Sequence, residues 1–92
     1  MIKHIVVWKL KNKQDAKEMK ERLEALSGKI KVIQSLEVGI NILPINDFDV
    51  VLTVTFTNLD DLNIYQNHPD HLKVVAFIKQ VAEKRVAIDY EL

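Results

Sequence analysis

One short segment of the sequence holds most of the side chains that could carry acid–base chemistry. Residues 65–71 read YQNHPDH and place one phenol, Tyr65, and two imidazoles, His68 and His71, within seven residues. An imidazole can act as a general base near neutral pH, and a phenol can donate a hydrogen bond to a developing oxyanion. His4 is the remaining histidine of the chain. If His4, Tyr65 and His71 converged in an apolar pocket, they would form a typical small-molecule site.

Each of these side chains also has a structural interpretation. His68 precedes a proline, and a histidine in such a turn often caps the neighbouring helix. His71 on an apolar face can be a partly buried histidine with a satisfied hydrogen bond, and Tyr65 can be core packing with its hydroxyl at the rim. His4 can tie the first strand to the segment 68–71 through a hydrogen bond. Both interpretations stay open at this level.

The hydrophobic periodicity predicts four strands that could position these residues. Residues 2–10 alternate with period two, which predicts a strand in which His4, Val6 and Trp8 share one face. Further strands are predicted over 32–42, 48–56 and 85–92. Leu36 and Leu52 lie on the faces of the second and third strands that we expect to meet the helices.

Three helical segments are predicted between these strands. Apolar residues at spacings of three and four predict an amphipathic helix over 14–27. A short helix that contains Tyr65 follows Asn58, a plausible N-cap. Pro69 interrupts this helix, because proline disfavours helical geometry at the preceding residue but suits the first turn of a new helix. The next helix is predicted from about Asp70 to Glu83, with His71 on its buried stripe.

The order strand, helix, strand, strand, helix, helix, strand predicts the α+β, ferredoxin-like βαββαβ plan. Its four-stranded antiparallel sheet would carry the helices on one face. The other face is also predicted to be apolar, through Ile5, Val7, Ile33 and Val51. The simplest cover for that face is the same face of a second subunit, which predicts a homodimer that forms a dimeric α/β barrel.

The composition narrows the classes of partner and cofactor. With 92 residues the chain is expected to form one domain, 1–92, and its 13 basic and 13 acidic residues do not favour a nucleic-acid partner. The apolar runs are too short to span a membrane. The absence of cysteine excludes disulfides and fits a cytoplasmic protein. No phosphate-binding loop or metal-ligand spacing occurs, so we expect no cofactor and no metal.

Four segments form a recognisable combination: MIKHIVVWKL at residues 1–10, SLEVG at 35–39, YQNHPDH at 65–71 and DYE at 89–91. In these segments the sequence resembles the stress-responsive A/B barrel domain family, also called the dimeric α/β-barrel (Dabb) family, over essentially the whole chain. The resemblance implies a ferredoxin-like subunit and a homodimer whose two sheets form the barrel.

The resemblance also implies a possible chemistry. Some plant members of the family are polyketide cyclases that close a linear polyketide by an intramolecular aldol condensation without a cofactor. Their working tyrosine and histidine match Tyr65 and His71, and a further pocket histidine matches His4. By this analogy His71 would take a proton from a substrate carbon and Tyr65 would stabilise the enolate oxygen. His4 and His68 would be supporting pocket residues.

Three functions follow from these observations. The one we favour is a dimeric barrel that binds a small apolar or aromatic molecule between sheet and helices. The pocket residues expected for it are His4, Val6, Trp8, Leu36, Leu52 and His68. The second is a cofactor-independent cyclase-like or isomerase-like enzyme with His71 as general base and Tyr65 as oxyanion donor. The third is a purely structural dimeric module, in which the histidines only stabilise the fold.

Overall fold

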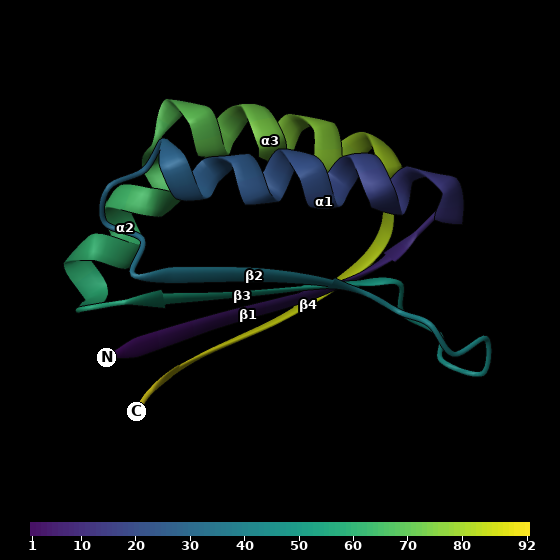
Figure 1. The fold of residues 1–92 in the computed structure, drawn as a ribbon, viewed down its shortest axis with the longest axis horizontal. Coiled ribbons are helices and arrows are strands. Elements are labelled where there is room, and N and C mark those ends of the chain that lie inside the picture. The colour runs from purple at the N-terminus through teal and green to yellow at the C-terminus, as the bar shows by residue number, and fades with distance from the viewer.

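A four-stranded antiparallel sheet forms one layer of the molecule in a computed structural model that describes residues 1–92 (Figure 1). Its strands are β1 (Ile2–Leu10), β2 (Ser35–Ile40), β3 (Val50–Phe56) and β4 (Ala82–Glu91). They lie in the order β2-β3-β1-β4. The first strand, β1, therefore lies inside the sheet, between β3 and β4. The last strand in the sequence, β4, lies at an edge.

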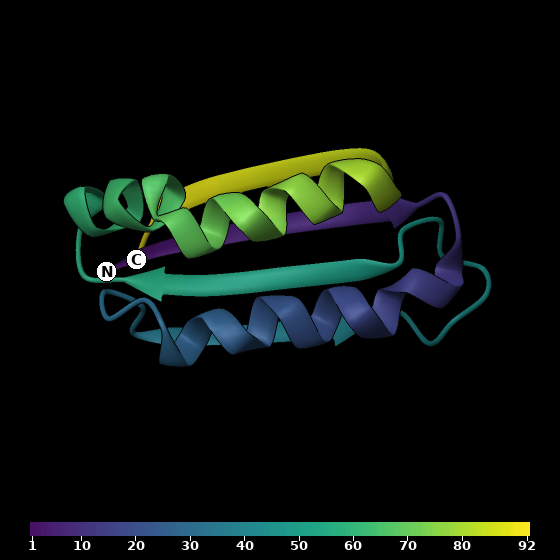
Figure 2. The ribbon, with the colours of Figure 1, turned by 90° about the horizontal axis from the view of Figure 1, so that it is seen from above.

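The helices form a second layer on one face of the sheet (Figures 1 and 2). They are α1 (Ala16–Glu24), α2 (Leu59–Asn67) and α3 (Pro69–Val81), and short 3-10 segments, η1 (Lys13–Asp15) and η2 (Ala25–Gly28), flank α1. Seen from above, α1 lies over β2 and α3 lies over β1, with β4 beyond α3 (Figure 2). The predicted α+β, ferredoxin-like plan with helices on one face is confirmed.

The predicted boundaries need correction in several elements. The helix expected over 14–27 is α only over Ala16–Glu24, because its ends tighten into 3-10 turns. The strand expected over 32–42 shortens to Ser35–Ile40, and the one expected over 48–56 begins at Val50. Ile33 precedes β2 and packs against the core, so placing it on the outer face was wrong. The strand expected over 85–92 begins directly after α3, at Ala82.

The core lies between the sheet and the helices. Burial along β1 alternates at every residue, and the even-numbered positions are the buried ones. Helix α1 contributes Met19 and Leu23, which are 0% and 1% exposed. The alternation expected for a strand with one covered face is therefore present in β1, and it aims His4, Val6 and Trp8 at the helices.

The opposite face of the sheet, which we call the outer face, has no helix on it. The strand register places Val7 opposite both Val51 of β3 and Val86 of β4, and it places Ile5 opposite Ile88. Val51, Val86 and Ile88 are exposed. An apolar stripe therefore crosses three strands on the outer face. No helix in the molecule has the length and apolar character needed to cross a membrane.

Candidate functional site

A cavity of about 340 Å³ lies between the sheet and the helices. This volume is within the range of small-molecule sites, about 300–1,000 Å³. It is bounded by β1 and β3 below, by α1 and α3 above and by β4 at one side. The lining residues are His4, Val6, Trp8, Leu23, Leu52, Gln66, His71, Val75, Ile78, Lys79 and Arg85.

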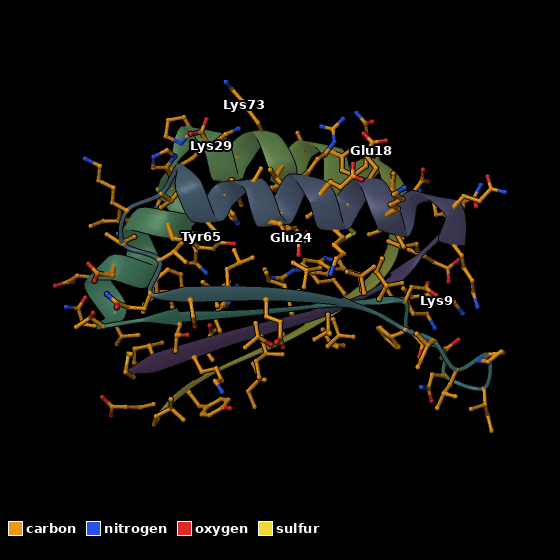
Figure 3. All side chains as sticks on the ribbon, viewed as in Figure 1. Lys9, Glu18, Glu24, Lys29, Tyr65 and Lys73 are labelled. Atoms are coloured by element: carbon orange, nitrogen blue, oxygen red, sulfur yellow. The ribbon has the colours of Figure 1, made fainter.

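Most of the residues predicted for the site meet at this cavity. His4, Val6, Trp8, Leu52 and His71 line it. Tyr65 does not line the cavity but lies in the layer between α2 and the sheet, fully buried (Figure 3). Its ring centroid is 4.3 Å from that of His71 and 6.1 Å from that of His4, so the predicted polar trio does form one cluster.

Two predicted pocket residues lie elsewhere. Leu36 lies on the edge strand β2 opposite Val54, at the other edge of the sheet from β4, and does not line the cavity. His68 is the N-cap of α3, where its Nδ1 accepts a hydrogen bond from the backbone N–H of Asp70 at 3.1 Å. The geometry therefore supports the capping interpretation of His68, which engages this side chain in the turn.

The break at Pro69 sets the hydrogen bonding of His71. In a continuous helix the N–H of Asp70 would donate to the carbonyl of Gln66, but here it donates to His68. The ring Nδ1 of His71 lies 3.1 Å from the Gln66 carbonyl oxygen and donates to it. Because a neutral imidazole carries one proton, this bond leaves Nε2 as the nitrogen with a free lone pair.

The surroundings of His71 keep its imidazole neutral. Burial lowers the pKa of His71, and the nearby positive charge of Arg85 acts in the same direction. The hydrogen bond to Gln66 opposes this shift but does not reverse it. A neutral imidazole with a free Nε2 is the form that can accept a proton from a substrate.

Two buried polar groups beside the cavity have no hydrogen-bond partner within the chain. They are the hydroxyl of Tyr65 and the indole N–H of Trp8. Burial raises the pKa of Tyr65 far above its ordinary value, so its hydroxyl stays protonated and remains a donor. A buried donor without an acceptor costs about 1–3 kcal/mol. Of these two residues Trp8 lines the cavity, so Trp8 is the one at which an oxygen atom of a ligand would be stabilised.

His4 has a partner that sequence reasoning missed. The β1–β4 register places His4 directly opposite Asp89, and His4 Nδ1 forms a short hydrogen bond to the Asp89 carboxylate. His4 is 4% exposed, while the Asp89 side chain is 40% exposed. The expected bond from His4 to the segment 68–71 is therefore replaced by a cross-strand bond. This pairing fixes the orientation of the His4 ring at the cavity wall.

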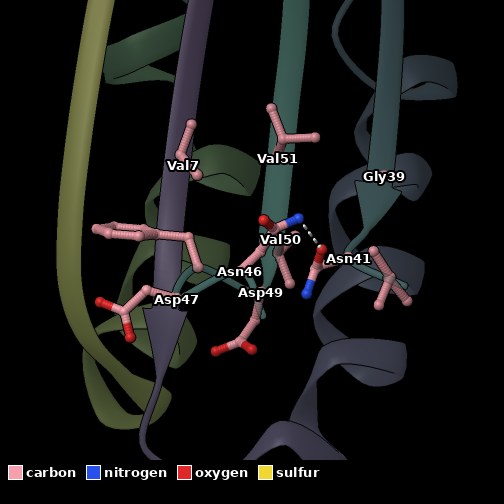
Figure 4. A pocket seen from close by; sticks show the side chains of 10 residues that line it. Val7, Gly39, Asn41, Asn46, Asp47, Asp49, Val50 and Val51 are labelled. Atoms are coloured by element: carbon pink, nitrogen blue, oxygen red, sulfur yellow. Dashed lines mark hydrogen bonds between the residues drawn. The ribbon is translucent and has the colours of Figure 1, made fainter. Parts of the chain in front are cut away.

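A second hollow, of about 440 Å³, lies on the outer face beside the loop between β2 and β3 (Figure 4). Val7, Gly39 and Val51 line it from the sheet. Its polar groups are already engaged: the side chain of Asn46 donates to Asn41 Oδ1 at 2.9 Å, and Asp49 accepts from the backbone of Leu10. This hollow therefore belongs to the apolar outer face and offers no group for acid–base chemistry.

No group of three His, Cys, Asp or Glu side chains in the molecule is placed to hold a metal ion. The chemistry that remains is that of imidazole, phenol and indole groups around an apolar cavity. The fold and this cavity together define a ferredoxin-like α+β subunit of the dimeric α/β-barrel type.

Comparison with known proteins gives the family. The family model of the stress-responsive A/B barrel domain matches residues 2–92, and the chain belongs to this family. A dimeric protein of unknown function with a ferredoxin-like fold from Bacteroides fragilis is 37% identical, with a TM-score of 0.91; the match covers 99% of this chain and 95% of that one.

Two more distant structures share the fold. A dimeric ferredoxin-like protein of unknown function from Thermobifida fusca is 23% identical (TM-score 0.88), with 99% of this chain and 90% of that chain covered. A hydroxynitrile lyase from Passiflora edulis is 17% identical (TM-score 0.86), with 99% and 92% covered. A search of curated proteins finds no match. The comparisons therefore give the family and the fold, and they include both enzymes and proteins without an assigned reaction.

Proposed function

We propose that this chain forms a dimeric α/β barrel that binds a small, largely apolar molecule in the cavity between its sheet and its helices. The observation that carries the proposal is the composition of the cavity wall. Apolar side chains, among them Val6, Leu23 and Ile78, make up much of it, and a few polar side chains complete it. This is the usual composition of a small-molecule site.

The homodimer is supported by the outer face and by the relatives. The apolar stripe through Ile5, Val7 and Val86 has no cover within one chain. The Bacteroides fragilis relative, at 37% identity, is described as dimeric. A second copy that faces the same stripe would bury it by the two-fold symmetry that most homodimers use. The cytoplasmic location stays a prediction from the composition.

Ligand binding can be tested through Trp8, the only tryptophan of the chain and a lining residue of the cavity. The test is a fluorescence titration with straight-chain amides from hexanamide to decanamide, followed at the Trp8 emission. Val75→Phe places a ring in the cavity and should abolish the response. Ala76→Phe adds the same ring at the adjacent exposed position of α3 and should leave the response unchanged.

Either of two results would reject this function. If the Trp8 emission of the wild-type protein did not change with an amide of any chain length, the cavity would not be a binding site for apolar molecules. Equal responses of Val75→Phe and wild type would place the bound molecule outside the cavity. In both cases the third function, a structural dimer in which the histidines only stabilise the fold, would gain support.

A second function, proton transfer at a carbon next to a carbonyl group, is favoured by one specific observation. The bond from His71 Nδ1 to the Gln66 carbonyl presents Nε2 as a base at the cavity wall. His71 would take a proton from the substrate carbon. Tyr65 packs against the ring of His71 at 4.3 Å but does not line the cavity, so its role as oxyanion donor stays a prediction. The hydroxynitrile lyase of the same fold is in keeping with a role of this kind for the scaffold.

This second function can be tested without knowing the natural substrate. We would follow the exchange of α-protons of 2-octanone for deuterium in D₂O by proton NMR. The wild-type protein should accelerate the exchange and His71→Gln should not, whereas His68→Asn should retain the activity because asparagine is also a good N-cap. Exchange that is equally fast in His71→Gln would exclude His71 as the base.

A further inference from the structure

Two positively charged side chains, Lys79 of α3 and Arg85 of β4, line the cavity without a carboxylate to neutralise them. Neither forms a salt bridge, and no Asp or Glu is among the lining residues. Other basic residues of the helical layer are paired with carboxylates, as Arg22 is with Glu18 and Lys20 with Glu24. Since the net charge of the whole chain is zero, the excess of positive charge at this cavity is a local feature.

Trp8 adds an uncharged donor at the same place. The β1–β4 register places Trp8 directly opposite Arg85, and both line the cavity. Trp8 is 3% exposed, and its indole N–H has no hydrogen-bond partner within the chain. An indole N–H and a guanidinium group are both donors and never acceptors. A ligand group that satisfies both must therefore present oxygen atoms, and a negative charge satisfies Arg85 best.

The rest of the wall is apolar. Leu23, Leu52, Val75 and Ile78 form it, from α1, β3 and α3. Helix α3 lies over β1 and leaves the edge strand β4 uncovered on the helical side (Figure 2). A molecule that places its apolar part under the helices therefore has its other end near β4, where Arg85 lies.

We propose that the ligand of this cavity is an amphipathic carboxylate, with its apolar body under α1 and α3 and its carboxylate at Trp8, Lys79 and Arg85. The inference rests on the proposed ligand-binding function and adds the chemical class of the ligand. Arg85 binds the carboxylate by charge and hydrogen bonding, Lys79 adds charge at the mouth, and Trp8 donates a hydrogen bond from the buried side.

The test compares octanoate with octanamide, which have nearly the same size and differ in charge. Binding of each is followed by Trp8 fluorescence and by calorimetry, at low and at high salt. We expect octanoate to bind about tenfold more tightly than octanamide at low salt, and we expect added salt to weaken only octanoate. Hexanoate and decanoate with their amides cover the neighbouring chain lengths.

The variants locate the charge effect. Arg85→Gln and Lys79→Gln should each reduce the preference for octanoate, and the double variant should bring the ratio of the two affinities close to one. Trp8→Phe, followed by calorimetry, should weaken octanoate while it leaves the ring in place. Lys73→Gln removes a positive charge from the outside of α3, where Lys73 points away from the sheet (Figure 3), and it should change neither affinity.

The outcomes separate the two proposals. Equal affinities of octanoate and octanamide for the wild-type protein would overturn the carboxylate inference and leave the apolar cavity as a binding site. An undiminished preference for octanoate in the double variant would also overturn it, because the charge would then be recognised elsewhere. No binding of either compound at any chain length would reject the carboxylate inference together with the proposed function.

Discussion

Ile88→Lys is the most direct test of the proposed dimer, because Ile88 is an exposed apolar residue of the outer face. It is opposite Ile5 in the sheet and is 59% exposed in the single chain. Lysine is well tolerated on an edge strand, so the subunit should still fold. In a two-fold dimer, each subunit would place one lysine into the interface, and the association should weaken.

The size of the effect follows from the buried area. Full burial of an isoleucine side chain contributes about 1.5–3 kcal/mol. Covering the exposed 59% of Ile88 is therefore worth about 0.9–1.8 kcal/mol in each subunit, or about 1.8–3.5 kcal/mol in the dimer. This corresponds to a dissociation constant that is larger by roughly 20- to 300-fold. Desolvation of the lysine charge adds to this loss, so these values are a minimum.

The assay is sedimentation equilibrium over a wide range of protein concentrations. Leu72→Lys is the matched control, because Leu72 is 52% exposed but lies on α3, in the helical layer. It should leave the dissociation constant unchanged. If Ile88→Lys and Leu72→Lys gave the wild-type constant alike, or if the wild-type protein were a monomer, the assignment of the outer face as the dimer interface would be refuted.

Three further predictions concern stability. Met19→Ala should lower the free energy of unfolding by about 2–5 kcal/mol, measured by urea denaturation, because Met19 is fully buried under α1; no loss would contradict the described core. Tyr65→Phe should not lower the melting temperature, since it removes a buried hydroxyl that has no partner, and a clear decrease would show that the hydroxyl has one. Burial lowers the pKa of His71, so the unfolded chain takes up this proton first as the pH falls. Stability should therefore decrease below about pH 6.5, the ordinary pKa of histidine, and His71→Gln should show a weaker decrease; equal pH slopes in thermal unfolding would contradict this.

The sequence predicted the architecture well because the strong periodic signals survive into the structure. Burial along β1 alternates at every position, and Pro69 separates two helices at the predicted place. The boundaries of β2 were predicted less well. Residues 32–34 read Val-Ile-Gln, and β-branched residues of this kind favour a strand, yet these residues form the turn before β2, and Val32 and Ile33 pack against the core. Local pattern alone does not distinguish a strand from a turn that buries its apolar side chains.

The parts of the site that the sequence did not reveal depend on strand register. Asp89 and Arg85 are separated from their partners His4 and Trp8 by most of the chain, and only the β1–β4 pairing places them opposite one another. The β1–β4 pairing has an irregularity between Lys9 and Leu10. A register that is counted along β4 from the turn after α3 would therefore be shifted for the residues beyond this irregularity. A one-residue shift moves every side chain of a strand to the other face. No sequence signal fixed the register, and the two residues were therefore missed.

The break at Pro69 connects the fold to the proposed chemistry. Because proline ends α2, His68 becomes the N-cap of α3 and accepts a hydrogen bond from the N–H of Asp70. The carbonyl of Gln66 is then free to accept a hydrogen bond from His71. The structural and the functional interpretations of this segment are therefore not alternatives for the segment as a whole. One histidine builds the turn, and the turn sets the tautomer and the orientation of the other histidine at the cavity wall. A role for His71 as a base thus depends on a capping bond made by a residue that does not line the cavity.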